Sequence, residues 1–187
     1  MSQFEFIFTL FGLLLGLSIA EVLGGFARAI EARLKPDTAV RIGWLVPLLG
    51  VFVLLDLLSF WTAAWVTRDL VSISGLSLMA ITCFAGAYYL AARLVFPREP
   101  EETPDFDAHF FRMRRIVLGA MFVLLLCQLA FYASQPKLAP LLLHPLSMGL
   151  TLVLVALMIA GMFVRGAVAS RIVMALLVAR YLVVYLL

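Results

Sequence analysis

The chain has 187 residues, of which 65% are hydrophobic and 13% are charged, and its formal net charge is +3. Its mean hydropathy is +1.11. A chain of this composition has too little polar surface to cover a water-soluble core, so lipid is expected to be its solvent. The basic residues are spread over short loops, which gives no indication of nucleic-acid binding. The composition therefore predicts an integral membrane protein in contact with a lipid bilayer.

Six apolar stretches are each close to the ~20 residues that a helix needs to cross a bilayer. They are residues 6–30, 42–65, 76–96, 116–133, 141–164 and 167–187. The pattern predicts an all-α bundle of six transmembrane helices, forming a single domain over 1–187. Residues 97–115 are polar and interrupted by proline, and we expect a cytoplasmic linker there. The first span has no basic region before it and is too long for a signal peptide, so it is expected to be retained.

The basic residues predict an orientation. Eleven of them lie around the connections that follow the first, third and fifth spans, against two, Arg68 and Lys137, in the other connections. The eleven are Arg28, Arg33, Lys35, Arg41, Arg93, Arg98, Arg112, Arg114, Arg115, Arg165 and Arg171. Because basic loops stay in the cytoplasm, both termini are predicted to lie on the non-cytoplasmic side. We expect a multi-pass protein of a bacterial inner membrane.

The first span carries small residues at successive four-residue steps, namely Gly12, Gly16, Ala20 and Gly24. Helices in lipid gain contact by close approach of their backbones, and such a stripe permits it. Two interpretations stay open. The stripe can pack within the monomer, or it can form an interface with another protomer or with a membrane partner subunit.

Ionisable residues inside the spans are costly to bury unless they are paired or hydrated. Asp56 in the second span and Arg180 in the sixth are each about 20 Å from the cytoplasmic face, at 1.5 Å per residue. Gln128 and His144 fall in the same outer third of the membrane. These four residues predict a polar layer. It is either a structural ion pair with two satisfied polar neighbours, or part of a substrate or proton path.

Glu21 defines a second polar cluster, nearer the cytoplasmic side. Arg28 lies two turns further along the same helix face, and Arg171 enters the sixth span at a comparable depth. Such a group is either a satisfied ion pair near the interface or an inner station of an alternating-access path.

The residue inventory predicts neither a metal site nor a cofactor. His109 and His144 are the two histidines and are expected on opposite sides of the membrane, which excludes bis-histidine haem. The run Asp105, Asp107, His109 has metal-ligand spacing, but a solvated loop explains it as well. Aromatic residues near the ends of two spans are expected to be interfacial anchors. These are Trp44, Trp61, Trp65, Tyr181 and Tyr185.

The sequence leaves three classes of function. The first is a small permease or channel-like protein, expected to be a homo-oligomer, that moves a small solute or ion past the polar layer. The second is a non-catalytic accessory or scaffold subunit that docks through the small-residue stripe. The third is an intramembrane enzyme, which is disfavoured because His144 with Ser147 is the nearest approach to a nucleophile and base at one depth.

Overall fold

The computed structural model describes residues 3–35, 40–67, 70, 74–100, 103 and 105–186, with side chains from residue 8 onward. Arg68 and parts of the expected linker, residues 101–102 and 104, lie outside the described residues. The helices of the described part are α1 (Gln3–Leu34), α2 (Leu45–Val66), α3 (Gly75–Arg93), α4 (Phe106–Ser134), α5 (Ala139–Leu143), α6 (Pro145–Phe163) and α7 (Ala167–Leu186). All except the short α5 are long and apolar enough to cross a membrane. The predicted all-helical bundle with six spans is confirmed.

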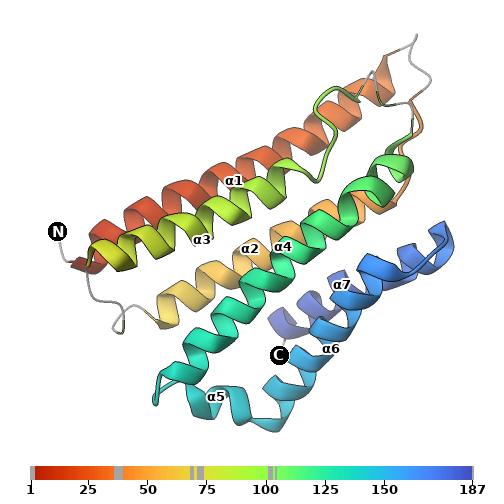
Figure 1. Ribbon diagram of the computed structural model, residues 1–187. Coiled ribbons are helices and arrows are strands. Elements are labelled where there is room, and N and C mark those ends of the chain that lie inside the picture. The colour runs from red at the N-terminus through yellow and green to blue at the C-terminus, as the bar shows by residue number, and fades with distance from the viewer. Residues whose placement is uncertain are drawn as a thin grey trace.

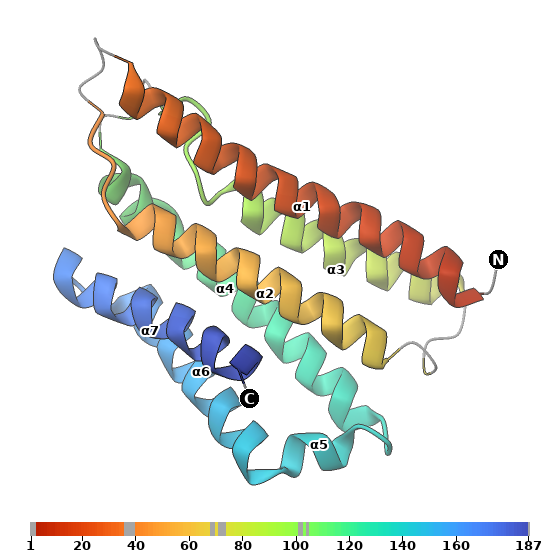
Figure 2. The same ribbon diagram turned by 180° about the vertical axis from the view of Figure 1, so that it is seen from behind.

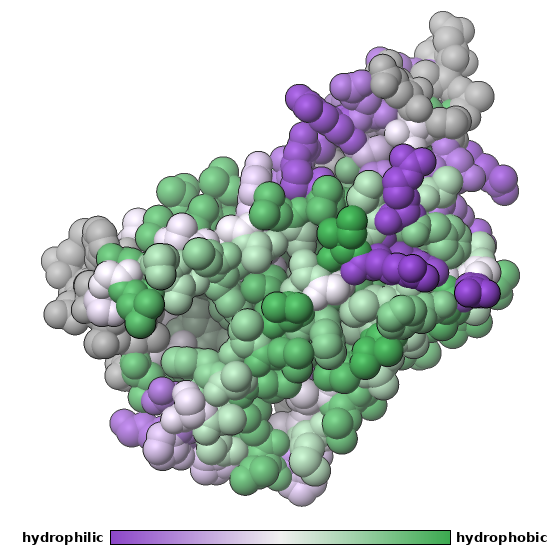
Figure 3. All heavy atoms as spheres, in the orientation of Figure 1, coloured by the Kyte–Doolittle hydropathy of each residue, from purple (hydrophilic) through white to green (hydrophobic). Residues whose placement is uncertain are grey.

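The six long helices form three layers of two (Figures 1 and 2). α1 lies beside α3, α2 and α4 form the middle layer, and α6 lies beside α7. We call the end of the bundle that holds the start of α1 the N-terminal end, and the opposite end the basic end. In Figure 3 the hydrophilic residues gather at the basic end, while hydrophobic residues cover most of the visible side of the bundle. This distribution is typical of a protein whose long axis crosses a bilayer.

The buried side of α1 explains why this helix packs on α3. Its buried positions are separated by alternating steps of four and three residues, which keeps them on one face of the helix. These positions are Phe11, Leu15, Ser18, Val22, Gly25, Ala29 and Ala32. The predicted stripe of Gly12, Gly16, Ala20 and Gly24 therefore lies to the side of this seam.

Phe96, which follows α3, packs between two layers of the bundle toward the basic end. Its ring lies between α1 and α2, with the centroid 4.8 Å from that of Phe26. A Cβ atom at Gly25 would collide with the ring of Phe96, and one at Gly50 would lie 3.0 Å from both rings. Glycine at these two positions lets the bundle close around the phenylalanine.

Two boundaries differ from the sequence prediction. The expected span 141–164 is broken at His144, whose backbone is extended with φ −63° and ψ 128°, because Pro145 disfavours helical backbone in the residue before it. α4 begins at Phe106, so the helix takes in the second half of the expected linker 97–115. Asp105 caps this helix by accepting a hydrogen bond from the Asp107 backbone N–H at 2.8 Å.

The turn between α6 and α7 has a buried arginine as its anchor. Arg114 of α4 donates hydrogen bonds to the carbonyl oxygen of Gly161 at 3.3 Å, to that of Val164 at 2.5 Å and to Ser170 Oγ at 3.4 Å. Carbonyl groups in the last turn of a helix lack partners within the helix, so this guanidinium caps α6. Gly166 in the turn has φ +94°, a conformation that favours glycine. The short turn predicted after the fifth span is thus present.

Candidate functional site

A cavity of about 340 Å³ lies between the first two layers at the N-terminal end of the bundle. α1, α2, α3 and α4 all contribute to its walls, and the surface is hollowed there in Figure 3. Ligand sites in proteins commonly measure ~300 to 1,000 Å³, so the cavity has the size of a small site. Its lining consists of Phe8, Phe11, Phe60, Ala63, Ala64, Thr67, Ser77, Ala80, Ile81, Phe84, Cys127, Gln128, Phe131 and Tyr132.

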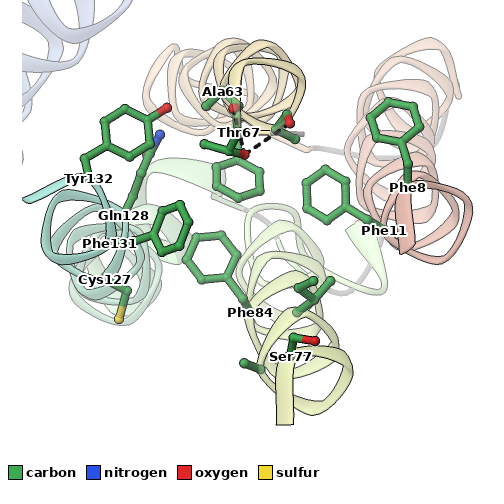
Figure 4. A pocket seen from close by; sticks show the side chains of 14 residues that line it. Phe8, Phe11, Ala63, Thr67, Ser77, Phe84, Cys127, Gln128, Phe131 and Tyr132 are labelled. Atoms are coloured by element: carbon green, nitrogen blue, oxygen red, sulfur yellow. Dashed lines mark hydrogen bonds between the residues drawn. The ribbon is translucent and has the colours of Figure 1, made fainter. Parts of the chain in front are cut away.

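The walls are largely aromatic and uncharged (Figure 4). The rings of Phe11, Phe84 and Phe131 point into the cavity, whereas the sulfur atom of Cys127 points away from it. The ring centroids of Phe60 and Phe84 are 4.6 Å apart and the rings are stacked. Aromatic faces of this kind bind apolar groups and exclude water.

Two of the few polar side chains of the lining, Thr67 and Ser77, already have partners inside the protein. Thr67 Oγ1 donates to carbonyl oxygens of the preceding turn, those of Ala63 at 3.2 Å and Ala64 at 3.1 Å. Ser77 is engaged in the capping box at the start of α3. Gln128 and Tyr132 lie one turn apart on α4 and bring the remaining polar atoms of the lining. A polar ligand would therefore find few free partners in the cavity.

The aromatic floor of the cavity connects it to Asp56. Phe60 and Phe84 each pack against Tyr88, with centroid separations of 5.3 and 5.5 Å. The Tyr88 hydroxyl donates a hydrogen bond to Asp56 Oδ2 at 2.8 Å, and the Tyr181 hydroxyl donates to Asp56 Oδ1. One carboxylate thus joins α2, α3 and α7, one aromatic layer below the cavity.

The expected ion pair of Asp56 with Arg180 is not a direct contact. Within the described residues, the ion pairs are Glu21 with Arg28, Glu21 with Arg93, and Asp107 with Arg171. Arg180 Nε instead donates to the carbonyl oxygen of Leu150 at 3.3 Å, and its guanidinium carbon lies 4.7 Å from the ring centroid of Tyr181. A tyrosine therefore stands between the two charges. Two hydrogen bonds from tyrosines satisfy the carboxylate at lower desolvation cost than an arginine brought into contact.

The remaining members of the expected polar layer lie elsewhere. Gln128 belongs to the cavity wall, and His144 is exposed at the break between α5 and α6. Neither contacts Asp56 through a hydrogen bond in the described structure. The layer inferred from equal depth is thus divided among three places, because depth along a helix axis does not determine which face a residue occupies.

Glu21 forms a compact cluster toward the basic end. It accepts hydrogen bonds from Arg28 Nη2 at 3.0 Å and from Arg93 Nη1 of α3. The intrahelical partner agrees with the sequence interpretation, whereas the second arginine comes from α3 and is not Arg171. Arg171 of α7 pairs with Asp107 Oδ2 at 3.4 Å. The three-residue cluster joins α1 to α3 within the chain.

The small-residue stripe of α1 does not act as a single packing face. A Cβ at Gly12 would lie 3.1 Å from Trp61 of α2, and one at Gly24 would lie 3.4 Å from Arg28 Nη1. Gly16 and Ala20 are exposed, and a Cβ at Gly16 would meet nothing within 4 Å. The interpretation that the whole stripe packs within the monomer is wrong for these two middle residues. They face outward from the chain.

The run of possible metal ligands is divided among separate structural roles. Asp105 caps α4, Asp107 accepts a hydrogen bond from the Leu45 backbone N–H at 3.4 Å and pairs with Arg171, and His109 Nε2 lies 3.3 Å from the Leu94 carbonyl oxygen. In the described part of the chain, no three His, Cys, Asp or Glu side chains gather as metal ligands would.

The sequence interpretation missed the two tyrosines that bind Asp56. Tyr181 is 2% exposed, so its assignment as an interfacial anchor is wrong, whereas Tyr185 and the three tryptophans are exposed as anchors are. Tyr181 follows Arg180 directly, and in an apolar span the charge of the arginine is a stronger sequence signal than the tyrosine hydroxyl. The signal was a carboxylate in an apolar span, which requires hydrogen-bond donors from adjacent helices.

The six apolar spans, the polar basic end and the apolar sides together indicate a multi-pass helical membrane protein. The chain matches no protein-family model, no curated protein sequence and no solved structure. Its function is therefore argued from its own geometry.

Proposed function

We propose that the protein is a small permease-like protein of a bacterial inner membrane, which takes up an amphipathic solute from the non-cytoplasmic half of the bilayer. The observation that supports this proposal is the aromatic cavity of about 340 Å³ at the N-terminal end. By the positive-inside rule this end faces away from the cytoplasm, as the eleven basic residues around the opposite connections predict.

The position of Asp56 supports a path that continues inward from the cavity. Its carboxylate lies behind Tyr88, which is in ring contact with the cavity floor. A solute that displaced the Phe60 and Phe84 rings would disturb the hydrogen bond between Tyr88 and Asp56 and so loosen α3 from α2. Beyond this point, toward the basic end, Phe96 packs closely against Gly25 and Gly50. Alternating access would require the cavity to close as that end opens.

Cysteine accessibility tests for such a path. In a variant with Cys83→Ala and Cys127→Ala, we would introduce Ala64→Cys in the cavity wall or Val53→Cys, which is buried one turn inward of Asp56. A hydrophilic thiol reagent should label Ala64→Cys from the N-terminal face and Val53→Cys, slowly, from the basic face of reconstituted vesicles. Protection of Val53→Cys from both faces, in a folded protein, would overturn the permease proposal.

A second candidate is a scaffold or accessory role, alone or as a homo-oligomer. It is favoured by the outward-facing Gly16 and Ala20 of α1, since small residues exposed on a membrane helix permit a second helix to approach closely. This role requires no opening at Asp56, so the accessibility experiment separates it from the first.

A further inference from the structure

The polar atoms of the cavity wall indicate which class of ligand the cavity can bind. None of the fourteen lining residues is charged, and the hydroxyls of Thr67 and Ser77 are engaged with neighbouring groups, which leaves Gln128 and Tyr132 as the other polar side chains. A ligand group that needs several hydrogen bonds would lose its water here for few replacements, which is unfavourable. A hydrocarbon group has no such loss.

The location of the cavity points to the source of the hydrocarbon. Its walls come from four helices that are long and apolar enough to span the bilayer, so the surrounding solvent at this depth is the tails of lipids. The volume of about 340 Å³ is at the small end of the range for ligand sites. It is too small for a complete phospholipid and suits one tail.

We propose that the cavity binds one acyl tail of a bilayer phospholipid, whose headgroup stays at the N-terminal face of the membrane. The inference rests on the proposed role of the cavity as a ligand site and names the class of ligand. The tail would lie between Phe11, Phe84 and Phe131 and end on the stacked rings of Phe60 and Phe84. Tyr88 and Asp56 lie below this floor and would not contact it.

The test uses the full chain, purified in a mild detergent and analysed by native mass spectrometry for retained lipid. Wild-type protein should retain one phospholipid. Ala64→Phe, which adds a ring to the cavity wall, should reduce the retained fraction about tenfold or more, as should Ala80→Phe from the opposite wall. Ala130→Phe is the matched control: this residue is exposed on α4 outside the cavity, and its variant should retain lipid as wild type does.

A second measurement locates the tail. A phospholipid with a photoreactive diazirine near the end of one tail should label wild-type peptides containing Phe84 or Phe131, and this labelling should be lost in Ala64→Phe. Thermal unfolding of each variant establishes that it is folded. Retention of phospholipid by both folded filling variants, or labelling confined to outward-facing residues, would overturn the inference. Retention of a free fatty acid, of detergent alone or of nothing by wild type would also overturn it.

The two proposals fail separately. If Val53→Cys is protected from both faces while Ala64→Phe loses the lipid, the permease proposal fails and the cavity is a static lipid site. If Val53→Cys is labelled but wild type retains no phospholipid, the inward path stands and the ligand class is wrong.

Discussion

The two ends of the bundle are held together by different kinds of residue. At the basic end, Gly25 and Gly50 receive the ring of Phe96, and charged groups such as Asp107 and Arg171 join the helix ends. At the N-terminal end, α1, α2, α3 and α4 face one another with phenylalanine rings and leave a cavity. The glycines opposite Phe96 permit close packing around its ring, whereas the phenylalanine rings at the other end leave a space between them.

This contrast indicates where a membrane protein of this size can change shape. Without a hydrophobic force between helices in lipid, packing and polar contacts hold the bundle together. The basic end has both kinds of contact, and the N-terminal end has few polar ones. Asp56 lies between the two regions, bound by tyrosines of α3 and α7. Movement of the outer half would therefore be limited by this carboxylate.

The largest effect should come from closing the space that Phe96 fills. In Gly25→Ala the new Cβ would lie 2.9 Å from the Phe96 Cβ, which is fixed near the main chain. We expect a loss of about 1 to 3 kcal/mol in the free energy of unfolding. Gly24→Ala is the matched control, because its Cβ would meet the flexible end of Arg28 at 3.4 Å. That variant should be neutral or gain up to ~1 kcal/mol from helix propensity.

The free energy of unfolding of both variants is measured in mixed micelles. Equal stability of Gly24→Ala and Gly25→Ala would mean that the basic end is not tightly packed around Phe96, and the contrast between the two ends would be lost.

A similar effect is expected from Arg114, the buried arginine that caps α6. Arg114→Met replaces the aliphatic part of the side chain but leaves the carbonyl oxygens of Gly161 and Val164 without this partner. Hydrogen bonds from a charged group contribute ~1.5 to 3 kcal/mol, and we expect a destabilisation of about 2 kcal/mol. Arg115→Met provides the control, since Arg115 is exposed and has a hydrogen bond of 3.4 Å to the Met162 carbonyl oxygen. If both variants have the same free energy of unfolding, the hydrogen bonds from Arg114 to α6 stabilise the protein no more than the exposed Arg115 does.

The next prediction concerns the carboxylate between the two regions. Tyr181→Phe removes one donor to Asp56 and should cost about 1.5 kcal/mol or more. A double-mutant cycle between Asp56→Ala and Tyr181→Phe should give a larger coupling energy than one between Asp56→Ala and Arg180→Leu, because Asp56 bonds the tyrosine and not the arginine. Thermal unfolding of the five variants provides both cycles. A stronger coupling with Arg180 would restore the ion pair that the sequence alone suggested.

The spans could be predicted from the sequence because each is a local property, a run of apolar residues of sufficient length. The pairing of helices could not, because it depends on which faces meet. Glu21 illustrates this: Arg28 on its own helix was identified by spacing, whereas Arg93 comes from a helix 72 residues away in the sequence. The sequence prediction also missed the break before Pro145, because the apolar run continues on both sides of the proline.

The cavity was beyond sequence analysis for a related reason. In a membrane span, phenylalanine can face lipid, a neighbouring helix or a cavity, and the residue type is the same in all three cases. The sequence does not distinguish these outcomes for the phenylalanines of the cavity wall, such as Phe8, Phe60, Phe84 and Phe131. Gln128 was identified as a candidate for its polarity, but the structure places it in the cavity wall and not beside Asp56.

The smallest effect on stability is expected for the outward-facing part of α1. Gly16→Leu adds a side chain where nothing lies within 4 Å, so the free energy of unfolding of the monomer should change by less than about 1 kcal/mol. If Gly16 and Ala20 form an interface between copies of the chain, the same variant should shift the detergent-extracted particle toward the monomer mass. Light scattering reads out the mass, and Leu17→Ala, on a neighbouring exposed position, controls for changes in lipid contact. A particle mass unchanged from wild type would mean that this face contacts lipid, and it would remove the observation that favours the scaffold role. A large loss of stability would instead show that Gly16 packs within the chain.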